Sequence, residues 1–288
     1  MNSVGTSNGG RGDTPERQET APRAGHPFGH EHPQRVLTWR TAENSAGYLL
    51  PHLRPGLSLV DVSSGAGTVT LDLARRLAPG SVLGVDTSAL AVQQAAGLAF
   101  DEGVHNARFA VGNAYALPAE DASVDIVHAH QVLQHLDSPV AALREMRRVL
   151  KPGGILAARD ADYGAVAWYP KLAGLSSWIQ VYRAVHRFDG GDPDAGRALK
   201  AWARQAGFDT VSVSASIWCF SSEAEREWWG ESWAARVIEA DFASHAVESG
   251  AARLSELHEI SAAWHQWTED PDGWFGMPHG EIIAVRPS

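Results

Sequence analysis

The sequence predicts an α/β fold in which a doubly wound, mostly parallel sheet of seven strands is covered by helices. Residues 57–67 run from apolar residues through an acid into a Gly-x-Gly turn, and residues 68–78 then repeat apolar side chains at helical spacing. A second short apolar segment, 81–86, ends in another acid. Further short apolar segments alternate with helical patterns, which is typical of parallel sheets.

The first turn suits an anionic ligand. Gly65 and Gly67 permit a sharp turn and a close approach to the backbone, and the following helix directs its N–H groups and positive dipole end at the turn. Asp86 ends the second strand, where an acid accepts hydrogen bonds from ribose hydroxyls. Thr70 stands where a dinucleotide fingerprint has its third glycine, which disfavours a nicotinamide dinucleotide and favours a smaller adenosyl ligand.

The other elements follow in chain order. Strands are predicted at 107–111, 124–129, 153–158, 210–216 and 281–286, and helices at 39–51, 88–102, 139–149, through 178–185, 194–206, 223–245 and 254–267. Ser138 is expected to cap the helix that begins at Pro139. The two helices between the sixth and seventh strands form an insert where a short turn is usual, and ten of the eleven tryptophans lie beyond residue 160.

These elements predict five segments. They are a disordered tail at 1–25, an N-terminal lid and helix at 26–52, a cofactor-binding core at 53–220, a helical insert and substrate lid at 221–280, and the last strand of the core at 281–288. The lid carries three histidines within 26–33, but its prolines break any helical face and no cysteine or paired carboxylate completes a site. We therefore expect no metal.

The composition excludes other classes of partner. The net charge of −10 argues against nucleic acid, and no apolar run approaches the ~20 residues of a membrane helix. The single cysteine, Cys219, excludes an internal disulfide and, with no apolar signal core at the start, predicts a cytoplasmic protein. A small molecule is the expected partner.

Five motifs together carry a resemblance to a known family. They are residues 60–68, 84–86, 112–118, 123–127 and 150–154. On these residues the sequence resembles the class I S-adenosylmethionine-dependent methyltransferases of the ubiquinone/menaquinone-biosynthesis type, over about 36–220 and the last strand. The resemblance implies a Rossmann-like methyltransferase fold with an antiparallel last strand, S-adenosylmethionine as cofactor and S-adenosylhomocysteine as product.

The expected cofactor site combines motif positions with nearby polar residues. Its members are Arg40, Asp61, Ser63, Gly65, Gly67, Asp86, Thr87, Asn113, Ala114, His130 and Gln131. Asn113 replaces the family's usual Asp, and its amide oxygen still accepts a bond from the adenine amino group. Arg40 is expected either to pair with the methionine carboxylate or to be a solvated helix charge.

Two residues are predicted to do chemistry. His130 follows the fourth strand at the switch point of the sheet, where ligands bind, and is the predicted general base, with a structural role as the alternative. Tyr163 is the predicted partner in catalysis, with Tyr48, Tyr115 and Tyr169 as alternatives that the sequence does not separate. The residues expected to contact substrate are Phe28, His135, Tyr169, Trp229 and Trp233, since aromatic walls bind flat, partly polar molecules.

Residues 39–45, residues 128–135 and the aromatic insert are most similar to a microbial secondary-metabolite group within the family. That group includes indole C3-methyltransferases of tryptophan-containing cyclodipeptides, so the resemblance implies C3-methylation with pyrroloindoline formation. Alternatives are S- or O-methylation of a dithiol diketopiperazine or a quinol, and a non-catalytic cofactor-binding module. A homodimer through the insert is a further expectation.

Overall fold

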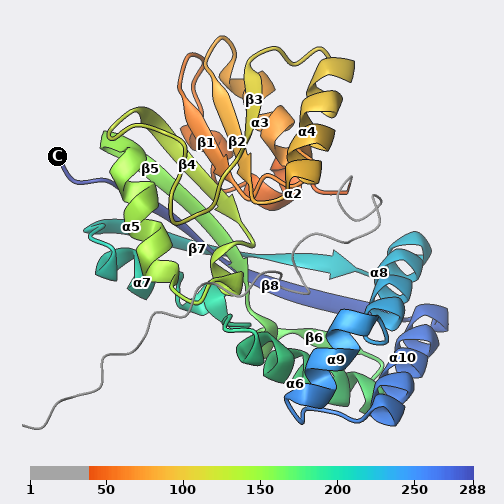
Figure 1. The fold of residues 1–288 in the computed structure, drawn as a ribbon. Coiled ribbons are helices and arrows are strands. Elements are labelled where there is room, and N and C mark those ends of the chain that lie inside the picture. Colours follow the sequence, from red (N-terminus) through yellow and green to blue (C-terminus); the bar gives the residue numbers. More distant parts are fainter. Residues whose placement is uncertain (1–38) are drawn as a thin grey trace, which may run out of the picture.

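The strands of this protein form one sheet, and its helices form two groups (Figure 1); the computed structural model describes residues 39–288. The strands are β1 (Leu59–Val62), β2 (Val82–Asp86), β3 (Ala107–Val111), β4 (Val124–His130), β5 (Leu150–Ala161), β6 (Ala167–Tyr169), β7 (Thr210–Phe220) and β8 (Trp274–Val285). The α-helices are α2 (Ala42–Ala46), α3 (Thr68–Leu77), α4 (Ala89–Asp101), α5 (Pro139–Val149), α6 (Ala173–Phe188), α7 (Leu199–Gln205), α8 (Glu223–Arg236), α9 (Ala240–Glu248) and α10 (Leu254–Glu269). Short 3-10 helices are η1 (Leu50–His52), η2 (Leu133–His135), η3 (Tyr163–Ala165) and η4 (Ala195–Arg197).

The strand order confirms the predicted doubly wound sheet. It runs β3-β2-β1-β4-β5-β8, with β7 paired to the other side of β8. β1 to β5 are parallel, whereas β8 is antiparallel to both β5 and β7. The chain winds outward from β1 in both directions, so the carboxyl ends of β1 and β4 form the switch point where ligands bind in such sheets.

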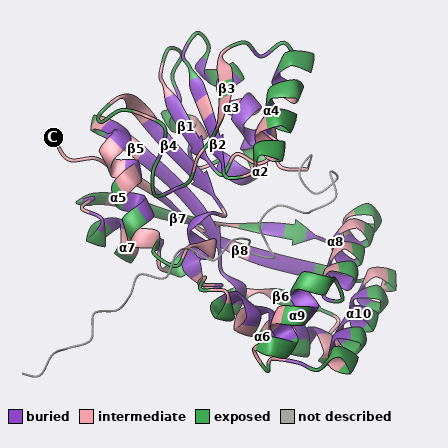
Figure 2. Cartoon of the chain, in the orientation of Figure 1, coloured by how far each residue is buried: buried purple, intermediate pink, exposed green. Residues whose placement is uncertain are grey.

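Helices cover both faces of the parallel part of the sheet. α2, α3 and α4 pack on one face, in a core that includes Leu71, Leu73 and Ala99. α5 and α7 pack on the other, around Leu143 and Leu199. Figure 2 shows the resulting band of buried residues along the central strands.

The antiparallel pair β7–β8 extends beyond the parallel sheet and carries a second group of helices. β5 pairs with β8 only over residues 279–285, whereas β7 pairs with it over 275–285. On the extension, β6 pairs with residues 274–276 of β8. We call α6, α8, α9 and α10 together with β6 the helical lobe (Figure 1). Its core is largely aromatic and includes Trp178, Trp264 and Trp267.

The structure differs from the sequence prediction in several elements. The predicted helix 223–245 is two helices, because a turn after Arg236 lets Phe242 of α9 join the core of the lobe. The helix expected over 39–51 is reduced to α2 and η1. β6 was not predicted, since three residues are too short to show a strand pattern. Ser138 makes no side-chain cap for α5.

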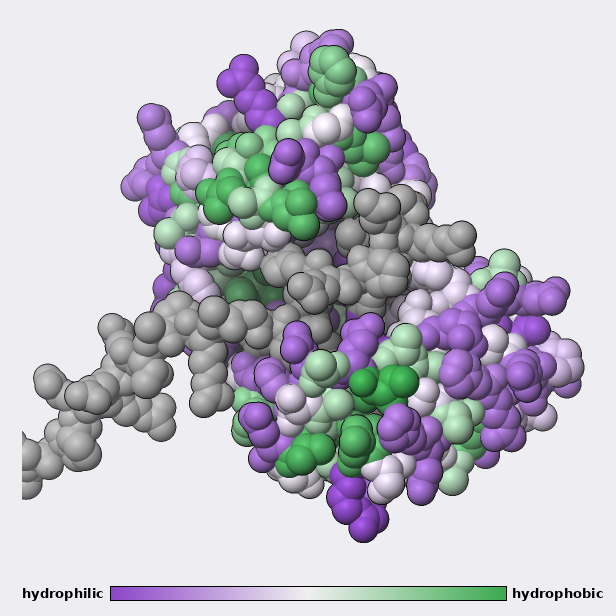
Figure 3. All heavy atoms as spheres, turned by 45° about the vertical axis from the view of Figure 1, so that its right-hand side comes forward, coloured by the Kyte–Doolittle hydropathy of each residue, from purple (hydrophilic) through white to green (hydrophobic). Residues whose placement is uncertain are grey.

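Two predicted segment boundaries also differ from the structure. The last strand begins at Trp274 rather than at 281, and α6 joins the helices of the predicted insert. The predicted tail at 1–25, Phe28 and the lid histidines lie outside the described residues. Within 39–288, no helix is long and apolar enough to cross a membrane. Figure 3 shows that hydrophilic residues predominate on the visible face of the lobe, with hydrophobic residues in smaller areas.

The geometry at Gly67 shows why this position of the glycine turn has no side chain. It precedes α3 with a φ of 87°, and a Cβ there would lie 2.9 Å from the Ala95 Cβ and 3.1 Å from the Phe109 Cζ. The missing side chain therefore permits close packing of the turn against α4 and β3, not a closer approach by ligand.

We predict that Gly67→Ala destabilises the fold by about 1–3 kcal/mol, because it adds both a steric conflict and strain at positive φ. Urea unfolding measures this. Gly97→Ala is the matched control: Gly97 lies inside α4 with open space around it, so alanine should stabilise the protein by roughly 0.5–1 kcal/mol. Equal midpoints for the two variants would contradict the packing role of Gly67.

Candidate active site

Two neighbouring cavities lie between the switch point and the helical lobe, and Arg40 lines both. We call the first, of about 410 Å³, the loop cavity. Its lining is Arg40, Asp61, Ser63, Ser64, Gly65, Ala66, Thr68, Val69, His128 and His130. We call the second, of about 650 Å³, the tryptophan cavity. Its lining is Trp39, Arg40, Gln131, Gln134, His135, Tyr163, Tyr182, Trp218, Trp228, Trp229, Ser232, Trp233, Arg236 and Met277.

The glycine turn of the loop cavity is held by Asp86. The Gly65 N–H donates to Asp86 Oδ2 at 2.9 Å, and the Ser88 N–H donates to Asp86 Oδ1 at 2.9 Å. Ser63 and Gly65 adopt positive φ angles of 56° and 54°, a conformation that Asp86 helps to maintain. The acid at the end of β2 therefore orders the turn, and its predicted contact with ribose remains a prediction.

A buried carboxylate–imidazole pair faces the loop cavity. The register of β1 and β4 places Asp61 opposite His128, and Asp61 Oδ1 lies 2.7 Å from His128 Nδ1. The Thr70 hydroxyl donates to Asp61 Oδ2 at 2.5 Å. In the neutral imidazole, the Nδ1–H of His128 donates a hydrogen bond to the Asp61 carboxylate, so Nε2 is left as an acceptor. This Nε2 has no partner among the described residues.

His130 has the opposite character, which argues against its predicted role as general base; that role stays a prediction. Its Nδ1 lies 3.5 Å from Arg159 Nη1, so the proton belongs on Nε2, which is buried without a partner among residues 39–288. Burial, with the charges of Arg159 and Arg40, holds the pKa of His130 well below its usual value. His130 is therefore a neutral hydrogen-bond donor and a weak base.

Arg40 is positioned by a chain of hydrogen bonds that begins on β8. The Nδ1–H of buried His279 donates to the Met277 carbonyl at 3.0 Å, and Gln131 Nε2 donates to His279 Nε2 at 2.9 Å. Arg40 Nη2 then donates to Gln131 Oε1 at 2.6 Å. Burial lowers the pKa of Arg40 to about 10, so its guanidinium remains charged at neutral pH with no carboxylate partner among the described residues.

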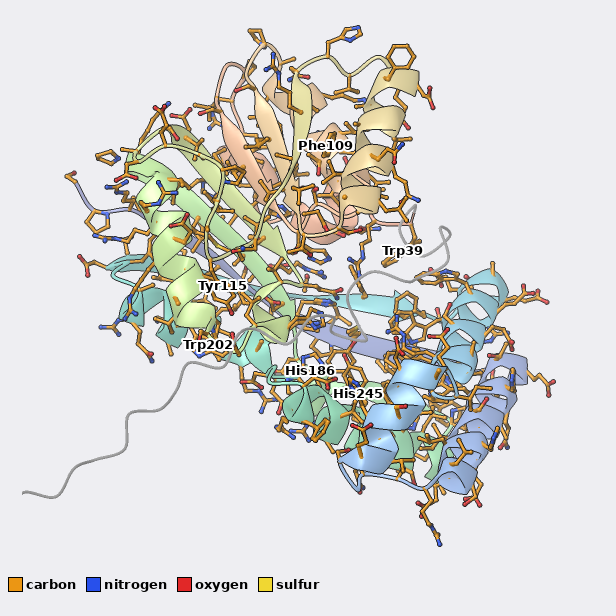
Figure 4. All side chains as sticks on the ribbon, viewed as in Figure 1. Trp39, Phe109, Tyr115, His186, Trp202 and His245 are labelled. Carbon is orange, nitrogen blue, oxygen red and sulfur yellow. The ribbon has the colours of Figure 1, made fainter. Side chains whose placement is uncertain are left out.

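Aromatic side chains from both parts of the molecule form the tryptophan cavity. Trp218 of β7 packs edge-on against Trp39 at 4.8 Å between ring centroids, and Figure 4 shows Trp39 between the parallel sheet and α8. Tyr163 packs against Tyr182 of α6, with ring centroids 4.2 Å apart and the ring planes tilted by 39°. Burial raises the pKa of both phenols, so each hydroxyl keeps its proton.

The structure unites most predicted substrate residues. His135, Trp229 and Trp233 line the tryptophan cavity, and so does Tyr163, the predicted partner in catalysis. Tyr169 does not, because its side chain is 57% exposed on β6. Phe28 lies outside the described residues.

Some predicted cofactor residues lie outside the loop cavity. Gln131 lines the tryptophan cavity instead, and Gly67, Asp86, Thr87, Asn113 and Ala114 line neither. The Asn113 side-chain oxygen accepts the Tyr115 N–H at 2.9 Å, which leaves a second lone pair for the predicted adenine contact.

Sequence reasoning missed several residues of the site. Trp218 and Met277 lie on strands whose extent was underestimated, and Arg236 lies at the end of α8. His128 was not among the predicted site residues, and only its register with Asp61 and the lining of the loop cavity bring it into the site. The one available signal was the tryptophan content of 218–233.

The loop cavity fits the amino-acid end of S-adenosylmethionine. A carboxylate would meet the Arg40 guanidinium, and an ammonium group would meet the unpartnered His128 Nε2 backed by Asp61. The Ser64 hydroxyl, also buried without a described partner, adds a further polar group. Within the described part of the chain, no group of three or more His, Cys, Asp or Glu residues is placed to hold a metal ion.

Asp160 supports the loop that carries Gln134 and His135. Its carboxylate is fully buried, and Oδ1 accepts the Gln134 N–H at 3.1 Å. Burial raises the pKa of Asp160 to about 7, although the backbone N–H groups of Gln134, Leu133 and Val132 oppose this. The neutral acid is therefore favoured in the folded protein only below about pH 7.

Comparison with known proteins agrees with this geometry. A family model described as a methyltransferase domain matches residues 60–158. An uncharacterized methyltransferase of Schizosaccharomyces pombe is 34% identical over 256 residues, which cover 86% of this chain and 91% of that protein. The probable methyltransferase ltbC of Aspergillus luteorubrus is 32% identical over 266 residues, which cover 86% and 92%. The solved YcgJ protein of Bacillus subtilis shares the fold, with a TM-score of 0.57 at 18% identity over 85% of this chain and 99% of that one.

We predict that Asp160 makes stability fall as pH rises. Its pKa is higher in the folded than in the unfolded protein, so the folded state holds an extra proton between about pH 4 and 7, and stability is lost through that interval. Urea unfolding should show that, across that interval, the free energy of unfolding of the wild type falls by roughly 2–4 kcal/mol more than that of Asp160→Asn, whose side chain stays neutral. Parallel pH curves for the two proteins would show that Asp160 ionises freely in the fold.

Proposed function

We propose that this chain, which belongs to the S-adenosylmethionine-dependent methyltransferases, transfers a methyl group to a small aromatic molecule bound in the tryptophan cavity. The observation that carries the proposal is that Arg40 lines both cavities. A cofactor held in the loop cavity would therefore border directly on an acceptor in the tryptophan cavity. Such adjacency is what group transfer between two bound molecules requires.

Residues of the loop cavity would hold the cofactor. S-Adenosylmethionine supplies a methyl group that is already activated on a cationic sulfur. Arg40 is placed to bind its carboxylate, and the Asp61–His128 pair to accept a hydrogen bond from its ammonium group. The Gly65 turn offers backbone next to the N-terminus of α3.

Residues of the tryptophan cavity would orient the acceptor. Trp218, Trp229 and Trp233 present flat apolar walls in the same cavity as the sequence-distant Tyr163. Gln131 lines this cavity, whereas His130 lines the loop cavity on the other side of the shared Arg40. In this arrangement both histidines belong to the loop cavity, where the Nε2–H of His130 can donate a hydrogen bond and the Nε2 of His128 can accept one.

The acceptor class rests on the sequence resemblance and on the aromatic walls. The indole of a tryptophan-containing cyclodipeptide, methylated at C3 with closure to a pyrroloindoline, is the first acceptor that these features support. A diketopiperazine dithiol and a demethyl quinol are the alternatives. All three present a flat or compact ring system that aromatic walls can contact.

Mass spectrometry tests the activity. We predict that the full chain, incubated with S-adenosylmethionine and these three acceptors, adds one methyl group to at least one of them. Loss of indole absorbance in a methylated cyclodipeptide would identify C3-methylation with ring closure. Cofactor binding by calorimetry without methylation of any acceptor would contradict the proposal and favour a non-catalytic binding module.

Variants of the two histidines accompany the test. His130→Ala should reduce turnover by less than about tenfold and leave its pH profile unchanged, because a weak base contributes little general-base catalysis. His128→Ala should weaken cofactor binding as well as turnover. A loss of 100-fold or more in His130→Ala, with a shifted pH profile, would restore His130 as the base.

A further inference from the structure

The polar groups of the tryptophan cavity are mostly hydrogen-bond donors. Of the described residues that line it, two are arginines and none is an aspartate or glutamate. The indole N–H groups of Trp228 and Trp229 are buried without a partner in the described structure. A molecule that fits this lining must bring hydrogen-bond acceptors of its own.

Arg236 is the main donor at the lobe side of the cavity. It is the last residue of α8, and its guanidinium stacks over Trp233 with Cζ 4.9 Å from the ring centroid. Its guanidinium makes no hydrogen bond or ion pair to another residue of 39–288, although the charge of Glu239 acts on it, and the residue is half-buried. Burial lowers the pKa of Arg236, which reflects the cost of holding this charge away from water.

Arg159 shows what a structural arginine looks like in the same region. Its side chain is fully buried, and Nε lies 3.1 Å from Ser216 Oγ and 3.3 Å from Glu281 Oε1. This buried arginine is therefore paired with a carboxylate of the fold. Arg236 has no such partner and points into a cavity.

A tyrosine hydroxyl adds a second donor near Arg236. Tyr163 lies beside Tyr182, with ring centroids 4.2 Å apart, and both side chains line the tryptophan cavity together with Arg236. Burial raises the pKa of both phenols, so each hydroxyl keeps a proton that it can donate.

We propose that Arg236, which lines the tryptophan cavity together with Tyr163 and Trp229, forms a subsite for an anionic oxygen of the acceptor molecule. This inference rests on the proposed function and, among its three acceptors, favours the quinol, bound as its phenolate, over the neutral cyclodipeptide; an aromatic molecule that carries a carboxylate would suit the subsite equally. A guanidinium binds such a group through two parallel hydrogen bonds and loses less in desolvation once the charge is paired. The aromatic ring of the acceptor then lies against the tryptophan walls.

Calorimetry with matched probes tests the subsite. With S-adenosylhomocysteine present, indole-3-acetate should bind at least tenfold more tightly than indole-3-acetamide, which has the same shape without the charge. In Arg236→Met the ratio should fall to about one, and in Arg236→Lys, which keeps the charge, part of the preference should remain. Arg204→Met is the control, since Arg204 is exposed on α7 and its loss changes the net charge equally.

A second pair of probes separates the two sources of negative charge. Preference for 4-nitrophenolate over 4-nitroanisole without preference for indole-3-acetate would identify a phenolate site, and the reverse a carboxylate site. Equal binding within both pairs, no binding of any probe, or an unchanged preference in Arg236→Met would overturn the proposal.

The proposed function and the anionic subsite are tested by separate measurements. Binding of S-adenosylhomocysteine and methylation of any acceptor are measured without these probes, so a neutral acceptor that is methylated would remove only the anionic subsite. Retained cofactor binding in Arg236→Met also shows that the variant is folded.

Discussion

The antiparallel pairing of β7 with β8 is the interaction on which the site depends. A parallel sheet alone provides a switch point that opens to solvent at the ends of β1 and β4. Because β7 and β8 continue past β5, they carry the helical lobe to that opening and supply Trp218 and Met277 to the cavity. The same strand β8 provides His279, whose hydrogen bond to Gln131 leads to Arg40.

Two cavities with different chemistry result from this arrangement. The loop cavity combines a guanidinium with a carboxylate-backed imidazole, which is complementary to an amino acid carrying both charges. The tryptophan cavity combines aromatic walls with donors and, among the described residues, no carboxylate. Arg40 lines both cavities, so its position sets how a ligand in one cavity faces a ligand in the other.

Local pattern was enough to predict the parallel core, because each strand–turn–helix unit is specified by neighbouring residues such as Gly65, Asp86 and Ser88. The tryptophan cavity could not be predicted in the same way. Trp218, Arg236 and Tyr163 come from three distant segments that meet only through β8 pairing and lobe packing. His128 and His130 show the same limit: alternation along β4 gives their spacing, but their proton positions depend on Asp61 and Arg159 across the sheet.

A crystal structure of the full chain with S-adenosylhomocysteine tests the central claim, the division of the two ligands between cavities that meet at Arg40. The account predicts that the amino-acid end of the ligand lies in the loop cavity, with its carboxylate on Arg40 and its amino group beside His128, and that the tryptophan cavity stays open for the acceptor. A ligand whose amino-acid end lies among Trp218, Trp229 and Trp233 instead would contradict it.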